Sequence, residues 1–236
     1  MFSRNKDAYT VQEQDILSKS LVVIFGCGGG GCVVAELLTR NGIGSLILID
    51  GDKFETSNLN RQIAATQDSI GKIKVEELKN RLTSINPNIN IKTLPVFAEE
   101  KKYELINNII KKQLKPDMGF CVCDTADKIK NKIIVSNFCT KYNYQLVSGG
   151  DGVYNCWVGR FTNIQKFNTL EYFKNINTLN SSCNNICAAP CTVWNQGSLQ
   201  ALTIINSLLG RDVNGKNNYI ITENLLSYTL LFEELK

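Results

Sequence analysis

Residues 21–31 read LVVIFGCGGGG, and this stretch decides the fold. Its first five residues are apolar and mostly β-branched, which predicts a buried strand. The glycines that follow satisfy GxGxxG from Gly26 to Gly31, and residues 33–44 have apolar residues at helical spacing until Gly42. A glycine-rich turn between a strand and a helix lets the backbone approach phosphates, which the helix N-terminus then stabilises. The stretch therefore predicts a nucleotide-binding βα unit.

Strands and helices continue to alternate along the chain. A second buried strand, SLILID, ends at Asp50. Later strands are predicted at residues 90–96, 120–124 and 144–150, and helices at 73–85, 103–113 and 133–142. From residue 153 we expect an antiparallel strand (153–161), an apolar helix (193–210) and two closing strands (218–235). This order predicts an α/β fold of the Rossmann-like, doubly wound type, with a mostly parallel sheet and a C-terminal antiparallel extension.

The pattern predicts a single domain over residues 1–236. Residues 1–150 form its nucleotide-binding half. Residues 151–236 supply a loop near 165–190 for a substrate tail, a core helix and the last strands.

Composition excludes several classes of function. There is no run of about eighteen apolar residues and no signal-peptide pattern at the start, so we expect a cytoplasmic protein with no membrane partner. Nine cysteines, an odd number, argue against a disulfide framework. A formal charge of +4 is too small to predict a nucleic-acid partner. The absence of histidine excludes histidine nucleophile activation, metal ligation and proton shuttling.

Three segments after the second strand are more specific than the glycine turn. They read IDGDKFETSNLNRQ (49–62), IGKIKVEELKNRLTSINPNI (70–89) and CDTADKIKNK (123–132). A nicotinamide enzyme has no need for a polar loop with an arginine after its second strand. In this order the chain resembles the ThiF/MoeB/HesA family, bacterial relatives of the ubiquitin-activating enzymes. The resemblance runs from FSRN at residues 2–5 to NQGSLQAL at 195–202.

The resemblance implies an adenylyltransferase that uses ATP and Mg²⁺. It places Gly29 against the phosphates, Asp50 on the ribose and Asp127 on the magnesium. It also implies that three residues reach the polyphosphate: Asn58 and the catalytic cations Arg61 and Lys74. The residue chemistry agrees, since joining a carboxylate to the α-phosphate of ATP brings two anions together and requires cations and a metal. The carboxylate is itself the nucleophile, so no general base is needed. The complete set of nucleotide-site residues predicted is Gly26, Gly28, Gly29, Gly31, Asp50, Asp52, Ser57, Asn58, Arg61, Lys74, Asp127 and Lys128.

The arginine of FSRN, Arg4, resembles the N-terminal arginine that family members extend into a partner subunit's nucleotide site. It therefore predicts a homodimer in which Arg4 acts in trans, with a solvated terminal arginine as the alternative.

Several residues keep two readings. Asp124 either shares the metal with Asp127 or caps the following helix. Asp52 either orients its loop or belongs to an ordinary turn. Lys72 is expected at the surface. Two positions depart from the family pattern: Lys128 replaces an asparagine, and Gly30 replaces an apolar residue.

The cysteines near the expected loop leave their roles open. Cys183 lies near the position of the family's catalytic cysteine, but Cys187 and Cys191 are close enough to compete for that role, and an ordinary loop thiol is the alternative. A structural zinc is not expected, because no second pair of cysteines follows Cys191 and histidine is absent.

The predicted reaction is ATP-dependent adenylylation of the C-terminal carboxylate of a ubiquitin-like sulfur-carrier protein, with release of pyrophosphate and later sulfur transfer. Activation of a peptide is an alternative substrate. A NAD-dependent oxidoreductase and a non-catalytic nucleotide-binding module are alternative functions. The sequence leaves the pathway open among thiamine, molybdopterin, cysteine and peptide modification.

Overall fold

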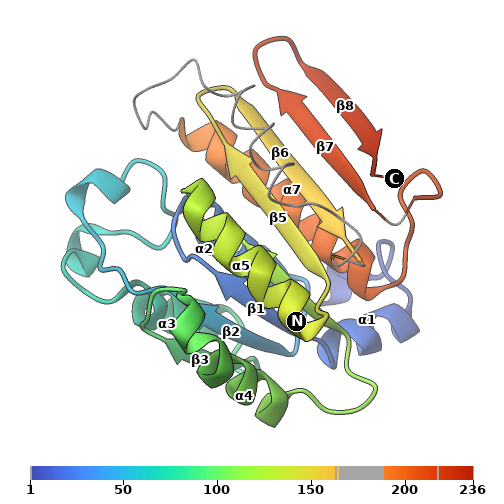
Figure 1. The fold of residues 1–236 in the computed structure, drawn as a ribbon, viewed down its shortest axis with the longest axis horizontal. Coiled ribbons are helices and arrows are strands. Elements are labelled where there is room, and N and C mark those ends of the chain that lie inside the picture. Colours follow the sequence, from blue (N-terminus) through green and yellow to red (C-terminus); the bar gives the residue numbers. More distant parts are fainter. Residues whose placement is uncertain (1, 163, 165–188, 217, 236) are drawn as a thin grey trace.

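A computed structural model of the chain describes residues 2–162, 164, 189–216 and 218–235. Its centre is an eight-stranded sheet with the order β3-β2-β1-β4-β5-β6-β7-β8 (Figure 1). The five strands β1 to β5 are parallel, and β6, β7 and β8 continue the sheet antiparallel to their neighbours. The predicted fold class is confirmed. The expected loop at 165–190 lies outside the described residues except for its last two positions.

The parallel strands lie where the apolar runs predicted them. They are β1 (Leu21–Phe25), β2 (Ser45–Ile49), β3 (Asn90–Leu94), β4 (Phe120–Asp124) and β5 (Leu146–Asp151). β1 is buried along its whole length between β2 and β4, which is why all five of its residues are apolar. The antiparallel strands are β6 (Asn155–Phe161), β7 (Tyr219–Asn224) and β8 (Thr229–Glu234).

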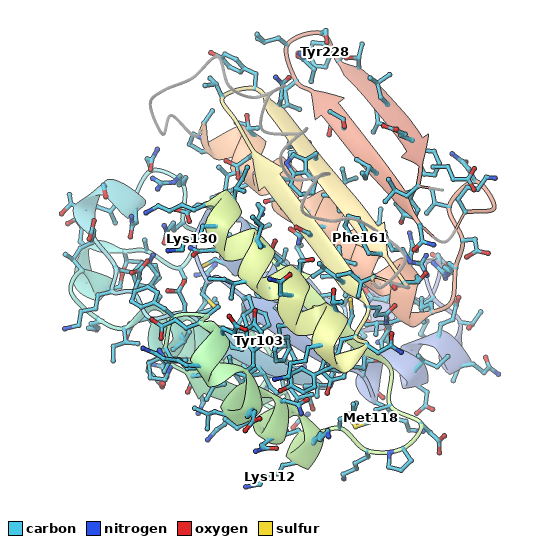
Figure 2. All side chains as sticks on the ribbon, in the orientation of Figure 1. Tyr103, Lys112, Met118, Lys130, Phe161 and Tyr228 are labelled. Carbon is cyan, nitrogen blue, oxygen red and sulfur yellow. The ribbon has the colours of Figure 1, made fainter. Side chains whose placement is uncertain are left out.

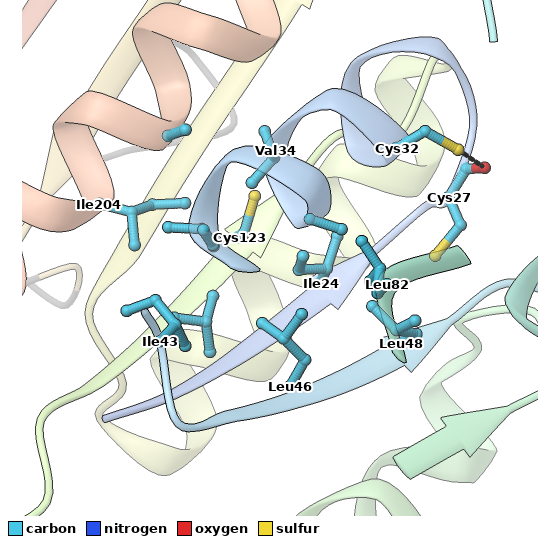
Figure 3. Packing of buried hydrophobic residues seen from close by; sticks show 14 of the residues in the cluster. Ile24, Cys27, Cys32, Val34, Ile43, Leu46, Leu48, Leu82, Cys123 and Ile204 are labelled. Atoms are coloured by element: carbon cyan, nitrogen blue, oxygen red, sulfur yellow. Dashed lines mark hydrogen bonds between the residues drawn. The ribbon is translucent and has the colours of Figure 1, made fainter. Parts of the chain in front are cut away.

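Helices cover both faces of the sheet. The first face carries α1 (Val11–Ser18), α2 (Gly29–Arg40), α3 (Lys74–Ile85) and α7 (Pro190–Leu208), whose apolar side chains share one core (Figure 3). The second face carries α4 (Tyr103–Gln113) and α5 (Ile129–Tyr142). Helix α1 was not predicted, although Thr10 and Glu13 form the T-x-x-E capping box that marks its start.

Aromatic side chains pack between α4 and α5, the two helices on the second face of the sheet. Tyr103 and Phe138 meet edge to face with centroids 5.3 Å apart, and the Tyr103 hydroxyl donates to the backbone oxygen of Ile134 on α5 (Figure 2). This contact holds α4 against α5. In the described residues no helix is long and apolar enough to cross a membrane.

Candidate nucleotide-binding site

A cleft of about 680 Å³ opens at the carboxyl ends of the parallel strands. Open α/β folds bind ligands at the carboxyl ends of their strands, at the point in the sheet where the strand order reverses. The predicted site residues that line it are Gly26, Gly28, Gly29, Asp50, Asp52, Ser57, Asn58, Arg61, Lys74 and Asp127. Segments far apart in sequence therefore converge on one cleft.

The glycine turn has the backbone geometry that its glycines permit. Gly26 has a φ of 91°, a conformation that residues with side chains rarely adopt. A Cβ on Gly29 would overlap the Val193 side chain of α7, so any larger residue would require Val193 to shift. The N-terminus of α2, with its unpaired backbone N–H groups, thus faces the cleft between β1 and α7.

Asp50 is held in place by backbone groups on both sides. Its Oδ2 accepts a hydrogen bond from the N–H of Cys27 (2.7 Å), and its Oδ1 accepts one from the N–H of Asp52 (2.8 Å). The carboxylate therefore links the glycine turn to the end of β2. It is fixed beside the glycine turn, where a carboxylate can accept hydrogen bonds from ribose hydroxyls.

Two cationic side chains, Lys74 and Arg61, line the cleft on the side formed by the segment that follows β2. Lys74, 6% exposed, ion-pairs with Asp52 at 3.2 Å, so Asp52 orients this lysine. Arg61 donates from Nη1 to the backbone oxygen of Ser57 (2.9 Å), while its own backbone oxygen accepts from Trp194 Nε1 of α7 (2.8 Å). Helix α7 therefore positions the loop that carries Arg61.

Asp127 and Asp151 face the same cleft from the ends of β4 and β5. Although Asp151 is accessible to solvent, the surrounding protein reduces its hydration, and this desolvation raises the pKa of its carboxyl above 3.8. Lys132 and Arg61 lower that pKa, and Asp127 raises it further. Asp151 thus lies within electrostatic reach of all three groups.

Neither of the two readings of Asp124 holds. The residue is fully buried, and its Oδ2 accepts from Ser148 Oγ (2.6 Å) and pairs with Lys132 Nζ (3.3 Å). Its Oδ1 accepts from the N–H of Ala126, which precedes α5, so it does not cap that helix. Because both carboxylate oxygens already have protein partners, Asp124 has a structural role beside the site.

Other predicted residues lie outside this cleft. Gly31 is buried behind the turn, where a Cβ would overlap the backbone oxygen of Gly26, so its role is close packing. Lys128 is exposed at the start of α5 and does not line the cleft. Lys72 pairs with Glu77 at the surface, as expected.

Arg4 is exposed near the opposite end of α2 from the glycine turn. The neighbouring Phe2 ring lies against Gly42, just beyond the end of α2. Twelve helical residues span about 18 Å, so Arg4 is too far from the glycine turn of its own chain to reach the phosphates. A role in nucleotide binding therefore requires a partner subunit.

Six described cysteines are buried. Burial raises the pKa of the thiols of Cys32 and Cys121 to about 12 and that of Cys156 to about 11. The other three buried cysteines are Cys27, Cys123 and Cys139. Cys191 is exposed at the start of α7, whereas Cys183 and Cys187 lie outside the described residues.

Sequence reasoning missed several residues of the site. Lys132 is 5% exposed and reaches Asp124, the backbone oxygen of Gly149 and the Trp157 ring, whose centroid is 5.3 Å away. Gln62 is 5% exposed and lines the cleft with its Oε1 lacking a described hydrogen-bond partner. The RQ pair that places Gln62 beside Arg61 was a usable signal, whereas nothing local marks Trp157 as a cleft residue.

Comparisons with known proteins show which proteins the chain resembles. The tRNA threonylcarbamoyladenosine dehydratase of Bacillus subtilis is 34% identical over 148 residues, which cover 62% of this chain and 55% of that protein. The molybdopterin-synthase adenylyltransferase of Haemophilus influenzae is 32% identical over 136 residues, or 58% and 52% of the two chains. The chain thus spans about half the length of the curated relatives it matches.

A solved structure of E. coli MccB with ATP superposes with a TM-score of 0.76 at 25% identity, covering 95% of this chain and 66% of that one. A sequence model of the ThiF family matches residues 2–236. The chain therefore belongs to the ThiF family.

Proposed function

We propose that the protein adenylylates the C-terminal carboxylate of a ubiquitin-like sulfur-carrier protein with ATP and releases pyrophosphate, so that sulfur transfer can follow. One observation carries the proposal. A single cleft holds the glycine turn, the fixed carboxylate of Asp50, the cations Arg61 and Lys74, and the carboxylate of Asp127. These are the groups needed to bind a ribose and a polyphosphate.

The reaction joins a carboxylate oxygen to the α-phosphorus of ATP and breaks the bond between the α- and β-phosphates. Both reactants are anions, so stabilisation of negative charge is the main requirement. The Arg61 guanidinium can donate two hydrogen bonds to phosphate oxygens, while Lys74 supplies a point charge. The attacking carboxylate is ionised at neutral pH and needs no general base, consistent with a chain that contains no histidine.

Magnesium fits the Asp127 side of the cleft. Within the described part of the chain, no side chain or backbone group forms a hydrogen bond or ion pair with the Asp127 carboxylate. The described residues also contain no group of three His, Cys, Asp or Glu that could form a closed metal site. Mg²⁺ is commonly bound by one or two carboxylates together with substrate phosphates and waters. Bound there, it would neutralise phosphate charge and favour the departure of pyrophosphate.

The carrier is inferred from relatives whose names include molybdopterin-synthase adenylyltransferase and the adenylyltransferase and sulfurtransferase MOCS3. A peptide carboxylate is an alternative acceptor. The 34% identity to a tRNA threonylcarbamoyladenosine dehydratase favours a third acceptor, a modified tRNA, which would overturn the expectation of no nucleic-acid partner.

The test is ATP–pyrophosphate exchange with Mg²⁺, with carrier proteins ending in Gly-Gly, peptides and tRNA added one at a time. Exchange is expected with a carrier. Arg61→Ala and Asp127→Ala should reduce it by about 10²- to 10³-fold, whereas Lys72→Ala and Lys130→Ala, at exposed positions outside the cleft, should leave it unchanged.

Other outcomes select among the alternatives. Exchange only with peptides or with tRNA would replace the carrier as substrate. ATP binding without exchange would indicate a non-catalytic module, and binding of NAD with no binding of ATP would favour an oxidoreductase.

A further inference from the structure

The cleft has an apolar end that the predicted site residues do not explain. Val96, Phe97 and Ala98, from the segment after β3, line it together with Ile129 and Val135 of α5. The groups that suit phosphates are Gly29 at the start of α2, Arg61 in the loop after β2 and Lys74 at the start of α3. If the ribose of a nucleotide bound at Asp50, the base would lie either against the apolar residues or against these polar groups.

Phe97 is the largest exposed group at this apolar end. Its side chain is 54% exposed, which is unusual for phenylalanine in a cleft. Three adjacent ring atoms, Cγ, Cδ2 and Cε2, lie at nearly equal distances of 2.8 to 2.9 Å from the position a Cβ would take at Gly51. One face of the ring therefore packs on the backbone of Gly51, and because Phe97 is exposed and lines the cleft, a ligand has access to the opposite face.

The position of this ring is set by the chain around it. Gly51 directly follows Asp50, the residue that suits a ribose, and Asp50 N–H donates to the backbone oxygen of Leu94 (3.2 Å). The N–H of Val96 donates to the same oxygen (2.8 Å). These bonds attach the segment that carries Phe97 to the end of β2.

We propose that Phe97 is the base-stacking residue of the site and that Gly51 is a glycine because its missing side chain lets the Phe97 ring lie flat beside the ribose position. A purine stacked on the open face would remove the exposed aromatic surface from water. Aromatic stacking on a base contributes about 1–3 kcal/mol, equivalent to about 5- to 150-fold in affinity. The inference rests on the proposed function, because it requires ATP to bind in this cleft.

The experiment measures binding of ATP and of tripolyphosphate by calorimetry in the presence of Mg²⁺. Tripolyphosphate reports on the polar end alone. Phe97→Ala should weaken ATP binding by about 5- to 150-fold and leave tripolyphosphate binding unchanged, while Phe97→Trp should retain ATP binding. Leu105→Ala, at a residue that is 52% exposed on α4 outside the cleft, is the matched control and should change neither.

Gly51→Ala is an independent variant. Gly51 has no positive φ, so alanine is not strained in the backbone, but its Cβ would displace the ring. It should weaken ATP binding in the same selective way. Unchanged ATP binding in Phe97→Ala would overturn the stacking role and leave the proposed function standing. Absence of ATP binding by the wild-type chain would overturn both.

Discussion

The side-chain carboxamide of Gln196 occupies the space that a side chain at position 30 would need, so Gly30 and Gln196 form a complementary pair across α2 and α7. Gln196 is 1% exposed and donates to Gln200, whose Nε2 in turn donates to the backbone oxygens of Asp124 (2.8 Å) and Val147. The departure from the family pattern at Gly30 thus has a structural explanation.

The contact between Gly30 and Gln196 predicts that the effect of Gly30→Ala on the free energy of unfolding depends on whether Gln196 is present. Gly30→Ala should lower the free energy of unfolding by about 1–3 kcal/mol, because the added methyl group overlaps the Gln196 carboxamide. In a Gln196→Ala background the same change should be neutral or stabilising, since alanine loses less entropy than glycine in a helix. Urea unfolding of the four proteins measures this. Equal losses in both backgrounds would show that the two sites are independent.

The buried ion pair between Lys132 and Asp124 predicts a large loss of stability when one partner is removed. Lys132→Met leaves the fully buried Asp124 carboxylate without its cation and should cost about 3–5 kcal/mol. Adding Asp124→Asn should recover part of this loss. Lys130→Met, at an exposed position on the same helix, is the control and should change stability by less than about 0.5 kcal/mol (Figure 2). A loss below 1 kcal/mol for Lys132→Met would contradict the assigned role.

The distance of Arg4 from its own cleft predicts complementation between inactive subunits. Arg4→Ala and Asp127→Ala should each reduce exchange by about 10²-fold or more. If the protein is a homodimer with Arg4 acting in trans, an equimolar mixture that exchanges subunits should recover about a quarter of wild-type activity, because half of the dimers carry one intact site. Refolding the two variants together and assaying exchange measures this. Full activity of Arg4→Ala would instead support a solvated terminal arginine.

Asp151 predicts a pH-dependent difference in stability. Desolvation raises the pKa of its carboxyl in the folded state, so the folded protein binds this proton more tightly than the unfolded chain does. The contribution to the free energy of unfolding therefore falls as the pH rises from 3.8 through the folded-state pKa, and it stays lower above that. Asp151→Asn should raise Tm relative to wild type at pH 7 but not at pH 3.5.

Thermal unfolding at the two pH values gives the result, with Asp68→Asn, an exposed position outside the cleft, as the control. A larger difference at pH 3.5 than at pH 7 would show that the direction of the shift is wrong.

The sequence alone determined most of the helices and strands and the edge of the sheet at which the site residues lie. The apolar run of β1, the glycine turn and the closing Gly42 are local signals, because strand burial, backbone freedom and helix termination depend on neighbouring residues. The strand ends placed Asp50 and Asp127 at one edge of the sheet, since parallel strands bring their carboxyl ends together. Helix α1 is the exception. Its eight residues have no strong apolar face, so the spacing of apolar residues does not predict a helix there.

The tertiary structure alone decided which side chains meet. The ring of Phe97 packs on Gly51 and Gln196 fills the space beside Gly30, and each pair joins segments that lie far apart in the chain. Lys132 turned inward to Asp124, while Lys128, four residues earlier, remained exposed. Such contacts depend on how helices pack on a twisted sheet and on which space neighbouring side chains leave, and neither quantity is encoded in the spacing of residues along a single segment.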